Sequence, residues 1–171
     1  TSIESRIDES SPRRQRSQGI VLIQNITSMQ IASFPSNLVH LDLDVKIFGV
    51  FLSSIFGAFK QLETFSMRNS TAVMGSNEKL AWPRNLRIFR AESLLCGRSA
   101  VPLEDILTER MTWLEELDLG LTSIKSTFTW PLRDLTPSLR KLAFELSHSD
   151  IEHVIALRND LPPTCSAVTI R

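Results

Sequence analysis

The stretch Leu114-Glu115-Glu116-Leu117-Asp118-Leu119-Gly120 places leucine at the first, fourth and sixth of six consecutive positions. Side chains alternate between the two faces of a β-strand, so the fourth and sixth leucines point to one face and the residues between them point to the other. The first leucine turns inward where the chain joins the strand. A single strand of this kind cannot bury its apolar side, and the pattern therefore predicts similar strands stacked beside it.

Five further segments carry the same 1-4-6 pattern of apolar residues. They are Leu38–Leu43, Leu62–Met67, Leu86–Ala91, Leu139–Phe144 and Cys165–Ile170. Leu86–Ala91 is the weakest copy, because alanine fills little volume. The six first positions are 38, 62, 86, 114, 139 and 165, which gives intervals of 24, 24, 28, 25 and 26 residues. All of them lie within the period of roughly 20–29 residues that is typical of leucine-rich repeats.

Prolines at Pro35, Pro83 and Pro137 precede three of the copies and favour extended chain before the turn into the strand. From about Ile20 onward the chain resembles the leucine-rich repeat family. The resemblance implies an α/β fold, a curved horseshoe segment of a solenoid. In such a fold a parallel β-sheet forms the concave face, and mixed helices and extended loops form the convex face.

We expect this domain to cover residues 19–171 as about six to seven irregular repeats. Residues 1–18 are polar, with clustered basic side chains, and predict a disordered lead-in. The chain begins with Thr1 rather than methionine and stops at Arg171, just after a predicted strand. We therefore expect it to be a fragment of a longer protein.

The sequence departs from the family pattern at the ninth position of each repeat, where the family usually has an asparagine that bonds to backbone groups inside the turn. The residues there are Lys46, Ser70, Leu94, Thr122 and Ser147. Serine and threonine can make a weaker version of that hydrogen bond, whereas lysine and leucine cannot. We therefore expect irregular repeats with uneven curvature and assign no subfamily.

The segments between the repeated strands predict a mixture of helices, short strands and loops. Ile20–Ile23 is β-branched and predicts a short opening strand. The spacing of apolar residues predicts a core-packed helix over Phe48–Phe59. Pro102 suits a helix start, and a capped amphipathic pattern predicts a helix over residues 149–157. Polar and Gly-containing composition predicts a loop over residues 69–80 and an extended segment over residues 124–137.

The charge and the apolar content of the sequence limit the classes of partner that we expect. The 171 residues include 19 basic and 19 acidic side chains, a formal net charge of +0. A nucleic-acid interface relies on excess positive charge, so we expect no nucleic-acid partner. No apolar run approaches the ~18–20 residues that span a membrane, and we expect no membrane insertion within this segment. Asn25-Ile26-Thr27 and Asn69-Ser70-Thr71 are glycosylation acceptor patterns that mildly favour an extracellular setting.

Motifs for catalysis, cofactor binding and metal binding are missing from the sequence. It has no H-E-x-x-H, G-x-S-x-G, phosphate-binding or C-x-x-C pattern. Of the three histidines (His40, His148 and His153), the last two are five residues apart, which does not place them on one helical face. We interpret Cys96 and Cys165 as small apolar fillers. We therefore expect no enzyme activity, no cofactor and no metal site in this segment.

The surface available to bind a partner is the outward side of the predicted strands, which is formed by the third, fifth and seventh positions of each repeat. The candidate partner-binding residues are His40, Asp42, Asp44, Thr64, Ser66, Arg68, Arg90, Glu92, Glu116, Asp118, Lys141 and Glu145. Polar and charged side chains on a rigid sheet suit a protein partner, through complementary charge and hydrogen bonds.

The family resemblance implies a protein-interaction or ligand-recognition module, because leucine-rich repeat proteins mostly act as recognition scaffolds. The alternative is a sensor region of a larger enzyme, such as a receptor-like kinase, with catalysis outside this segment. A transmembrane segment and a kinase domain in the flanking sequence would distinguish the second reading from the first.

Overall fold

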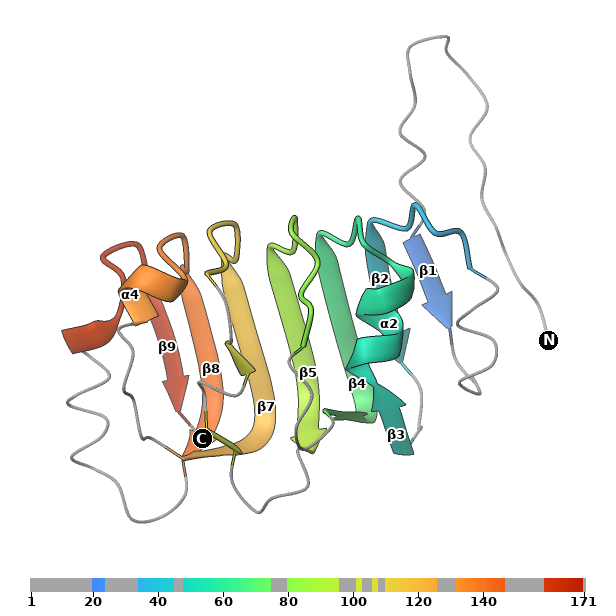
Figure 1. Cartoon of the computed structure of the whole chain (residues 1–171). Helices are drawn as coiled ribbons and strands as arrows, with labels where there is room; N and C mark the ends of the chain where they lie inside the picture. Colours follow the sequence, from blue (N-terminus) through green and yellow to red (C-terminus); the bar gives the residue numbers. More distant parts are fainter. Residues whose placement is uncertain are drawn as a thin grey trace, which may run out of the picture.

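One parallel sheet dominates the computed structural model of the chain (Figure 1). The structure describes residues 20–23, 34–44, 48–74, 80–95, 101–102, 106–107, 110–125, 132–146 and 159–170. Within these residues the strands are β1 (Ile20–Ile23), β2 (His40–Asp44), β3 (Phe48–Phe51), β4 (Thr64–Val73), β5 (Ile88–Leu95), β6 (Val101–Pro102), β7 (Glu116–Lys125), β8 (Lys141–Leu146) and β9 (Ala167–Ile170). The helices are α2 (Leu52–Ala58) and α4 (Leu132–Leu135).

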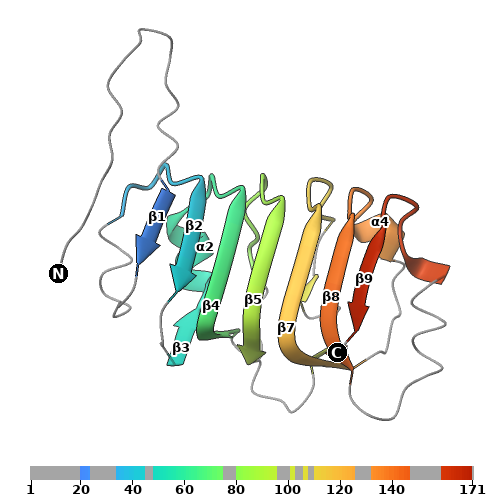
Figure 2. The ribbon, with the colours of Figure 1, turned by 180° about the vertical axis from the view of Figure 1, so that it is seen from behind.

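The strands follow one another across the sheet in sequence order, β1-β2-β4-β5-β7-β8-β9, with β3 beside β4 and β6 beside β7. Every pairing is parallel, and the sheet does not close on itself. The helices α2 and α4 lie on one side of it, and Figure 2 views the sheet from the other side, with both helices behind the strands. The predicted opening strand at Ile20–Ile23 is confirmed as β1.

The register of the six repeated segments is confirmed. Residues at the third position are Cα partners in successive strands: His40, Thr64, Ile88, Glu116, Lys141 and Ala167. In the first five segments, the apolar side chains at the first, fourth and sixth positions are all buried, none more than 3% exposed. The 1-4-6 pattern therefore marks the side chains that build the core.

Each repeated segment begins with the same backbone turn. The N–H of its first residue donates to the carbonyl three residues earlier, as in Cys165 to Pro162 at 2.9 Å. The carbonyl of the second residue then accepts two N–H groups of the next segment: Arg87 O accepts from Glu115 N at 2.7 Å and from Glu116 N at 3.0 Å. This doubled hydrogen bond recurs at all five junctions, so the varying intervals between segments are absorbed in the crossovers.

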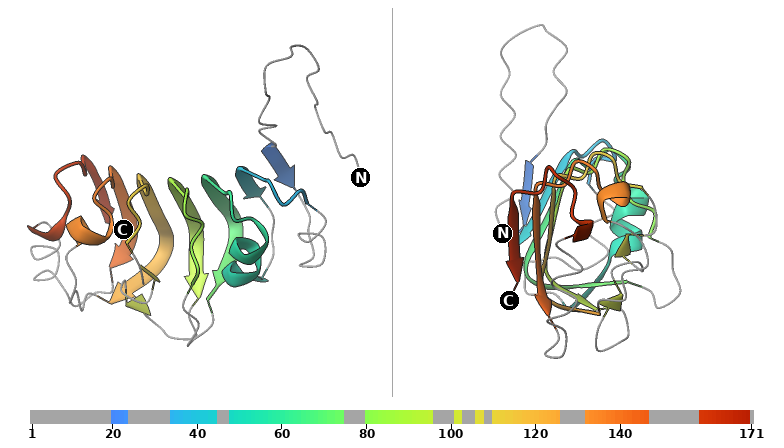
Figure 3. Two further views of the ribbon diagram at one scale, coloured as in Figure 1. Left: turned by 45° about the horizontal axis from the view of Figure 1, so that its top comes forward. Right: turned by 90° about the vertical axis from the view of Figure 1, so that its left-hand side faces the viewer.

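The core lies between the sheet and the crossovers that carry the helices (Figure 3). Phe56 of α2 lies 5.7 Å from Phe65, 6.3 Å from Phe89 and 5.2 Å from Trp82, measured between ring centroids. The Trp82 indole N–H donates to the carbonyl of Ile106 at 2.8 Å, which satisfies its one polar group inside the core. This aromatic cluster ties the helix to two strands of the sheet.

Strands β4 and β7 are ten residues long, and each contains a residue in the left-handed conformation. Asn69 in β4 and Gly120 in β7 both have φ 57°. The pairing of β4 with β5 shifts register between Met67 and Thr71, and the residues beyond the shift also pair with β3. Beyond Gly120, β7 pairs with β6 and with the end of β8. Figure 1 shows β7 bending at its lower end.

The prediction of one helix over Phe48–Phe59 is partly wrong. Phe48–Phe51 form β3, because the bent second half of β4 offers them a parallel partner and phenylalanine favours strands. The helix is limited to Leu52–Ala58. The predicted core packing is confirmed for Leu52, Ile55, Phe56 and Phe59, but the Phe51 side chain is 52% exposed.

Three other crossover predictions also differ from the structure. Residues 69–73, predicted as a loop, continue β4 because the bend at Asn69 keeps them in the ladder. Pro102, predicted at a helix start, lies in β6, a short strand that pairs with β7 and has no second partner among the described strands, so a missing N–H is tolerated there. Leu132–Leu135, predicted to be extended, form α4, where Leu132 is buried.

The predicted helix over residues 149–157, the lead-in over residues 1–18, Lys46 and Ser147 lie outside the described residues. At the ninth positions that are described, the hydrogen bond expected of threonine is confirmed: Thr122 Oγ1 accepts from Leu94 N–H at 2.9 Å. The Leu94 side chain instead fills the core. No helix of the described part has the length and apolar character that a membrane crossing requires.

Candidate functional site

The open face is the side of the sheet opposite α2 and α4 (Figure 2). We define it by the third, fifth and seventh residues of the segments in β2, β4, β5, β7 and β8. They are His40, Asp42, Asp44, Thr64, Ser66, Arg68, Ile88, Arg90, Glu92, Glu116, Asp118, Gly120, Lys141, Ala143 and Glu145. The structure places the predicted partner-binding residues in five neighbouring strands of one sheet. The Ser66 side chain is only 6% exposed, so it offers little surface to a partner.

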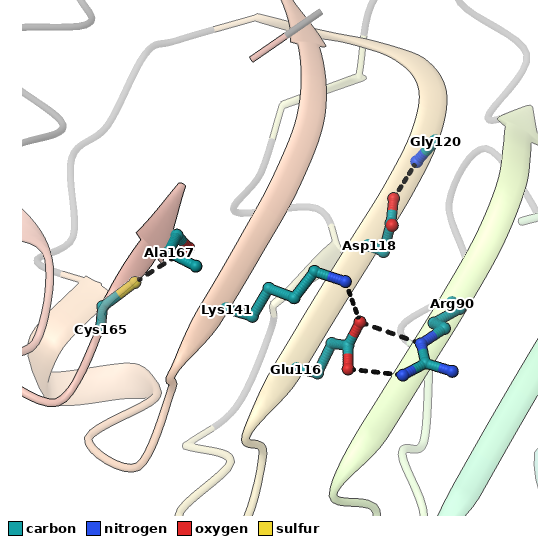
Figure 4. A network of polar contacts seen from close by, with 7 residues as sticks. All are labelled: Arg90, Glu116, Asp118, Gly120, Lys141, Cys165 and Ala167. Carbon is teal, nitrogen blue, oxygen red and sulfur yellow. Dashed lines mark hydrogen bonds and ion pairs between the residues drawn. The ribbon is translucent and has the colours of Figure 1, made fainter. Parts of the chain in front are cut away.

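Three charged side chains meet on the open face, over β5, β7 and β8. Arg90 Nε donates to Glu116 Oε1 at 2.9 Å and Arg90 Nη2 donates to Oε2 at 2.7 Å. Lys141 Nζ donates to Glu116 Oε1 at 2.6 Å. Figure 4 shows both cations reaching Glu116 from the strands on either side of β7. The Glu116 side chain is only 13% exposed, so this triad holds a nearly covered carboxylate between two cations.

These contacts determine the charge state of the triad. The hydrogen bond from Arg90 lowers the pKa of Glu116 from 4.5 to about 2, and Lys141 adds to that effect, while burial opposes it. The same hydrogen bond raises the pKa of Arg90, again against burial. Glu116 is therefore ionised and paired at any physiological pH.

Replacing Glu116 with glutamine is expected to lower the free energy of unfolding at pH 7 by about 1 to 2 kcal/mol, since it leaves two cations without their carboxylate. The loss is moderate because Arg90 and Lys141 are 47% and 42% exposed and solvent screens them. The folded-state pKa is the lower one, so the contribution of Glu116 is present above pH 4.5 and disappears as the pH falls towards 2.

Urea unfolding of both proteins between pH 7 and pH 2.5 measures this difference. Glu145→Gln is the matched control, since Glu145 has no ion pair in the described part of the chain. A Glu116→Gln deficit that stays constant down to pH 2.5 would contradict the assignment of the stabilisation to the ionised carboxylate.

A second group of contacts lies over β2 and β4. Arg68 Nη2 donates to Asp42 Oδ2 at 3.0 Å, and Asp42 Oδ1 is buried without a hydrogen-bond partner in the described structure. Asn69 Nδ2 donates to Asp44 Oδ1 at 2.6 Å, and the Asn69 backbone N–H donates to the carboxylate of Glu92. These contacts link β2 to β4 and β4 to β5.

Sequence reasoning missed these pairs. It gave the candidate residues without any contacts between them, whereas ion pairs join Arg68 to Asp42 and Arg90 to Glu116 across neighbouring strands. The signal available in the sequence is opposite charge on consecutive segments: in both pairs the arginine stands two positions further along its segment than the carboxylate does. It is clearest outside the face, where Arg87 and Glu115 both hold second positions and lie 2.6 Å apart.

The open face has more negative than positive charges, although the whole chain has a net charge of +0. Its cations are Arg68, Arg90 and Lys141. Its carboxylates are Asp42, Asp44, Glu92, Glu116, Asp118 and Glu145. Arg68 is paired with Asp42, and Arg90 and Lys141 are both paired with Glu116. The face therefore presents a net negative surface to a partner.

The described residues also show how the metal-ligating residue types, the cysteine and the glycosylation pattern considered in the sequence analysis are placed. The described residues hold no group of three or more His, Cys, Asp or Glu side chains placed to bind a metal. Cys165 is a free, half-buried thiol whose pKa is raised by burial, so it is a poor nucleophile near neutral pH. Asn69 of one glycosylation pattern lies in β4, and its side-chain amide donates to Asp44 of β2, which opposes its modification. Asn25, Cys96, His148 and His153 lie outside the described residues.

Comparison of the chain with protein-family models, with curated proteins and with solved structures finds no match. What the protein does is therefore inferred from the geometry and the charge of its open face.

Proposed function

We propose that this chain is part of a leucine-rich repeat solenoid and that it binds a protein partner on the open face, the concave side of the solenoid. The observation that supports this proposal most directly is the set of side chains on the open face. Strands β2, β4, β5, β7 and β8, in one register, hold charged and polar side chains on a surface that neither helix covers (Figure 2). No catalytic step is part of the proposal.

The repeated junction supports the solenoid. Each segment is joined to the next by the same doubled hydrogen bond, the first five segments bury the same apolar positions, and the strands are ordered as in the sequence. An architecture in which each unit contacts only its neighbours has these properties. Thr122 takes the role of the family's turn asparagine in one unit, which supports the resemblance where the sequence departs from it.

The arrangement of charge supports a protein partner with a basic surface. The triad fixes the positions of Arg90 and Lys141, because both are held by Glu116. The carboxylates of the open face are spread over β2, β5, β7 and β8 rather than gathered at one point. A broad, preorganised surface of this kind suits a protein better than a small molecule, which needs a concave and mostly apolar site.

The test is affinity capture with the immobilised chain, followed by purification of the captured protein and calorimetric titration. The face variant combines Asp44→Asn with Glu145→Gln, which remove two negative charges and keep the side-chain shapes. We expect about tenfold weaker binding and a smaller loss of affinity with added salt, because two interfacial charge contacts disappear.

The matched control combines Asp134→Asn with Asp160→Asn. Both residues lie in or near the crossovers, away from the open face, and the pair again removes two negative charges. The control is expected to bind like the unmodified chain. Equal affinity of the face variant and the unmodified chain would place the binding surface elsewhere and contradict the proposal.

A further inference from the structure

The six repeated segments all begin at the same edge of the sheet, because their strands are parallel and in one register. At this edge, which we call the turn edge, the chain enters each strand through the same hydrogen-bonded turn (Figure 1). The two central residues of each turn form its tip, and none of them is buried. They are Ser36 and Asn37, Lys60 and Gln61, Arg84 and Asn85, Thr112 and Trp113, Pro137 and Ser138, and Pro163 and Thr164.

The turn tips carry positive charge and no carboxylate. Lys60 and Arg84 hold the same position in consecutive turns, and neighbouring strands of a sheet are about 4.8 Å apart. Arg110 lies just before the next turn. All three side chains belong to exposed residues, and none forms an ion pair with another described residue. Three cations therefore line this part of the turn edge without a described counter-charge.

Charge is divided between the turn edge and the open face. Beside the three basic turns, the second positions of the segments hold Glu63, Arg87 and Glu115, and the last two form an ion pair. Cations therefore outnumber carboxylates in this part of the turn edge, whereas carboxylates outnumber cations on the open face. The turn edge thus favours an anionic partner, and the open face favours a basic one.

An exposed indole lies among these cations. The Trp113 side chain is 63% exposed at the tip of the turn before β7, whereas Trp82 is 5% exposed in the core. Tryptophan combines an apolar ring with an N–H donor, and such side chains concentrate where an apolar phase meets water. An exposed indole beside lysine and arginine is the combination that holds a peripheral protein at an anionic lipid surface.

We propose that the turn edge docks on the surface of an anionic lipid membrane. The indole of Trp113 lies among the headgroups, and Lys60, Arg84 and Arg110 face the lipid phosphate and carboxylate groups. The turn tips form a row along one edge of the sheet, so a flat surface can meet several of them at once. A small anion would instead need a concave site. The contact is confined to the headgroups and requires no membrane-spanning element.

Docking of this kind adds to the proposed function and does not rest on it. The strands of the open face lead away from the turn edge, so the open face stays accessible when the turns touch lipid (Figure 2). Three cations and one indole give weak and reversible binding. We expect half of the chain to be on the vesicles at about 1 mM accessible anionic lipid.

Co-sedimentation of the full chain with lipid vesicles tests the proposal. The vesicles consist of phosphatidylcholine alone or of phosphatidylcholine with about 30% phosphatidylserine. The turn variant combines Lys60→Gln with Arg84→Gln, and the indole variant is Trp113→Ser. All substitutions are at exposed positions, and circular dichroism establishes that each variant is folded.

Each variant has a matched control. Arg68→Gln with Arg90→Gln removes the same amount of positive charge as the turn variant does, but from the open face. Leu121→Ser removes an apolar side chain that is 59% exposed within β7, as Trp113→Ser does at the turn edge. These controls separate a docking surface from a general effect of charge or apolar exposure.

We expect the unmodified chain to bind the phosphatidylserine vesicles, to leave them as salt rises from about 0.05 to 0.5 M, and not to bind phosphatidylcholine alone. The turn variant and the indole variant are expected to bind about fivefold more weakly or less, and the two controls within about twofold of the unmodified chain. Tryptophan emission of the bound chain should shift to shorter wavelength, and Trp113→Phe should remove that shift. This last readout does not depend on the charge variants.

A chain that binds neither type of vesicle would overturn the proposal. Equal binding to both types, or equal weakening by the turn variant and its charge control, would also overturn it. Binding to soluble polyglutamate that the turn variant weakens, without binding to vesicles, would make an acidic protein the partner of the turn edge and reject the membrane. Binding of a basic protein to the open face is measured with the face variant, so failure of one proposal is distinguishable from failure of the other.

Discussion

Replacing Phe89 with alanine is expected to lower the free energy of unfolding by about 3 to 5 kcal/mol. The Phe89 side chain is fully buried, and its ring centroid lies 5.5 Å from Phe65, 5.1 Å from Trp82 and 6.3 Å from Phe56. Truncation leaves a cavity where two strands, α2 and a crossover meet, and none of these elements can close it without giving up its own contacts. Equilibrium unfolding in urea, followed by circular dichroism, measures the loss.

The matched control is Phe51→Ala, which makes the same chemical change at a ring that is 52% exposed at the end of β3. Its cost is expected to stay below about 1 kcal/mol, because little apolar surface is buried there. Similar losses for the two variants would mean that the aromatic core is not where the structure places it.

Gly120→Ala is expected to destabilise the chain by about 3 kcal/mol or more. Gly120 has φ 57°, a conformation that L side chains rarely adopt. A Cβ atom there would lie 2.1 Å from the carbonyl oxygen of Glu92 and 2.6 Å from that of Ala91. Both contacts are with backbone of β5, so relief requires β5 to separate from β7. Urea unfolding again measures the effect.

Gly57→Ala is the control for this substitution. Gly57 lies in α2, and a Cβ atom there would meet nothing within 4 Å. Alanine is favoured over glycine in a helix, so the free energy of unfolding is expected to stay unchanged or to rise by up to about 1 kcal/mol. If Gly120→Ala were tolerated as well as Gly57→Ala, the close approach of β7 to β5 would be contradicted.

The strands and their register could be predicted from the sequence because the signal is local and repeated. Leu41 and Leu117 are surrounded by the same pattern, and six copies at regular intervals leave one consistent alignment. Ala91 was the weakest apolar position in the pattern, yet it is buried at 2% exposure because its neighbours on both sides are large. A small residue within a stack of large ones is thus tolerated by the fold.

The crossovers were harder to predict because their structure depends on partners distant in sequence. Phe48–Phe51 has apolar spacing that fits a helix, and it becomes a strand only because β4 bends at Asn69 and continues beside it. Asparagine is one of the few residues that adopt the left-handed conformation, but its position in the chain does not by itself indicate a bend. The same holds for Pro102, whose strand partner lies beyond Gly120 in β7.

The positions of the candidate site followed from strand alternation, but its contacts did not. Alternation places Arg90 and Glu116 on one face without indicating that a fifth-position arginine reaches a third-position glutamate on the next strand. That pairing depends on side-chain length and strand offset. It turns a set of separate charges into the triad that lowers the pKa of Glu116.

The doubled backbone hydrogen bond at each junction has a consequence for how such a chain can evolve. Val39, Glu63 and Arg87 form the same contact with different side chains, so the junction does not depend on their identity. Duplication or deletion of one whole unit would recreate an existing junction and would leave the others unchanged. The reach of the open face could then grow or shrink in steps of one strand, about 4.8 Å, while selection tunes each new set of outward side chains independently.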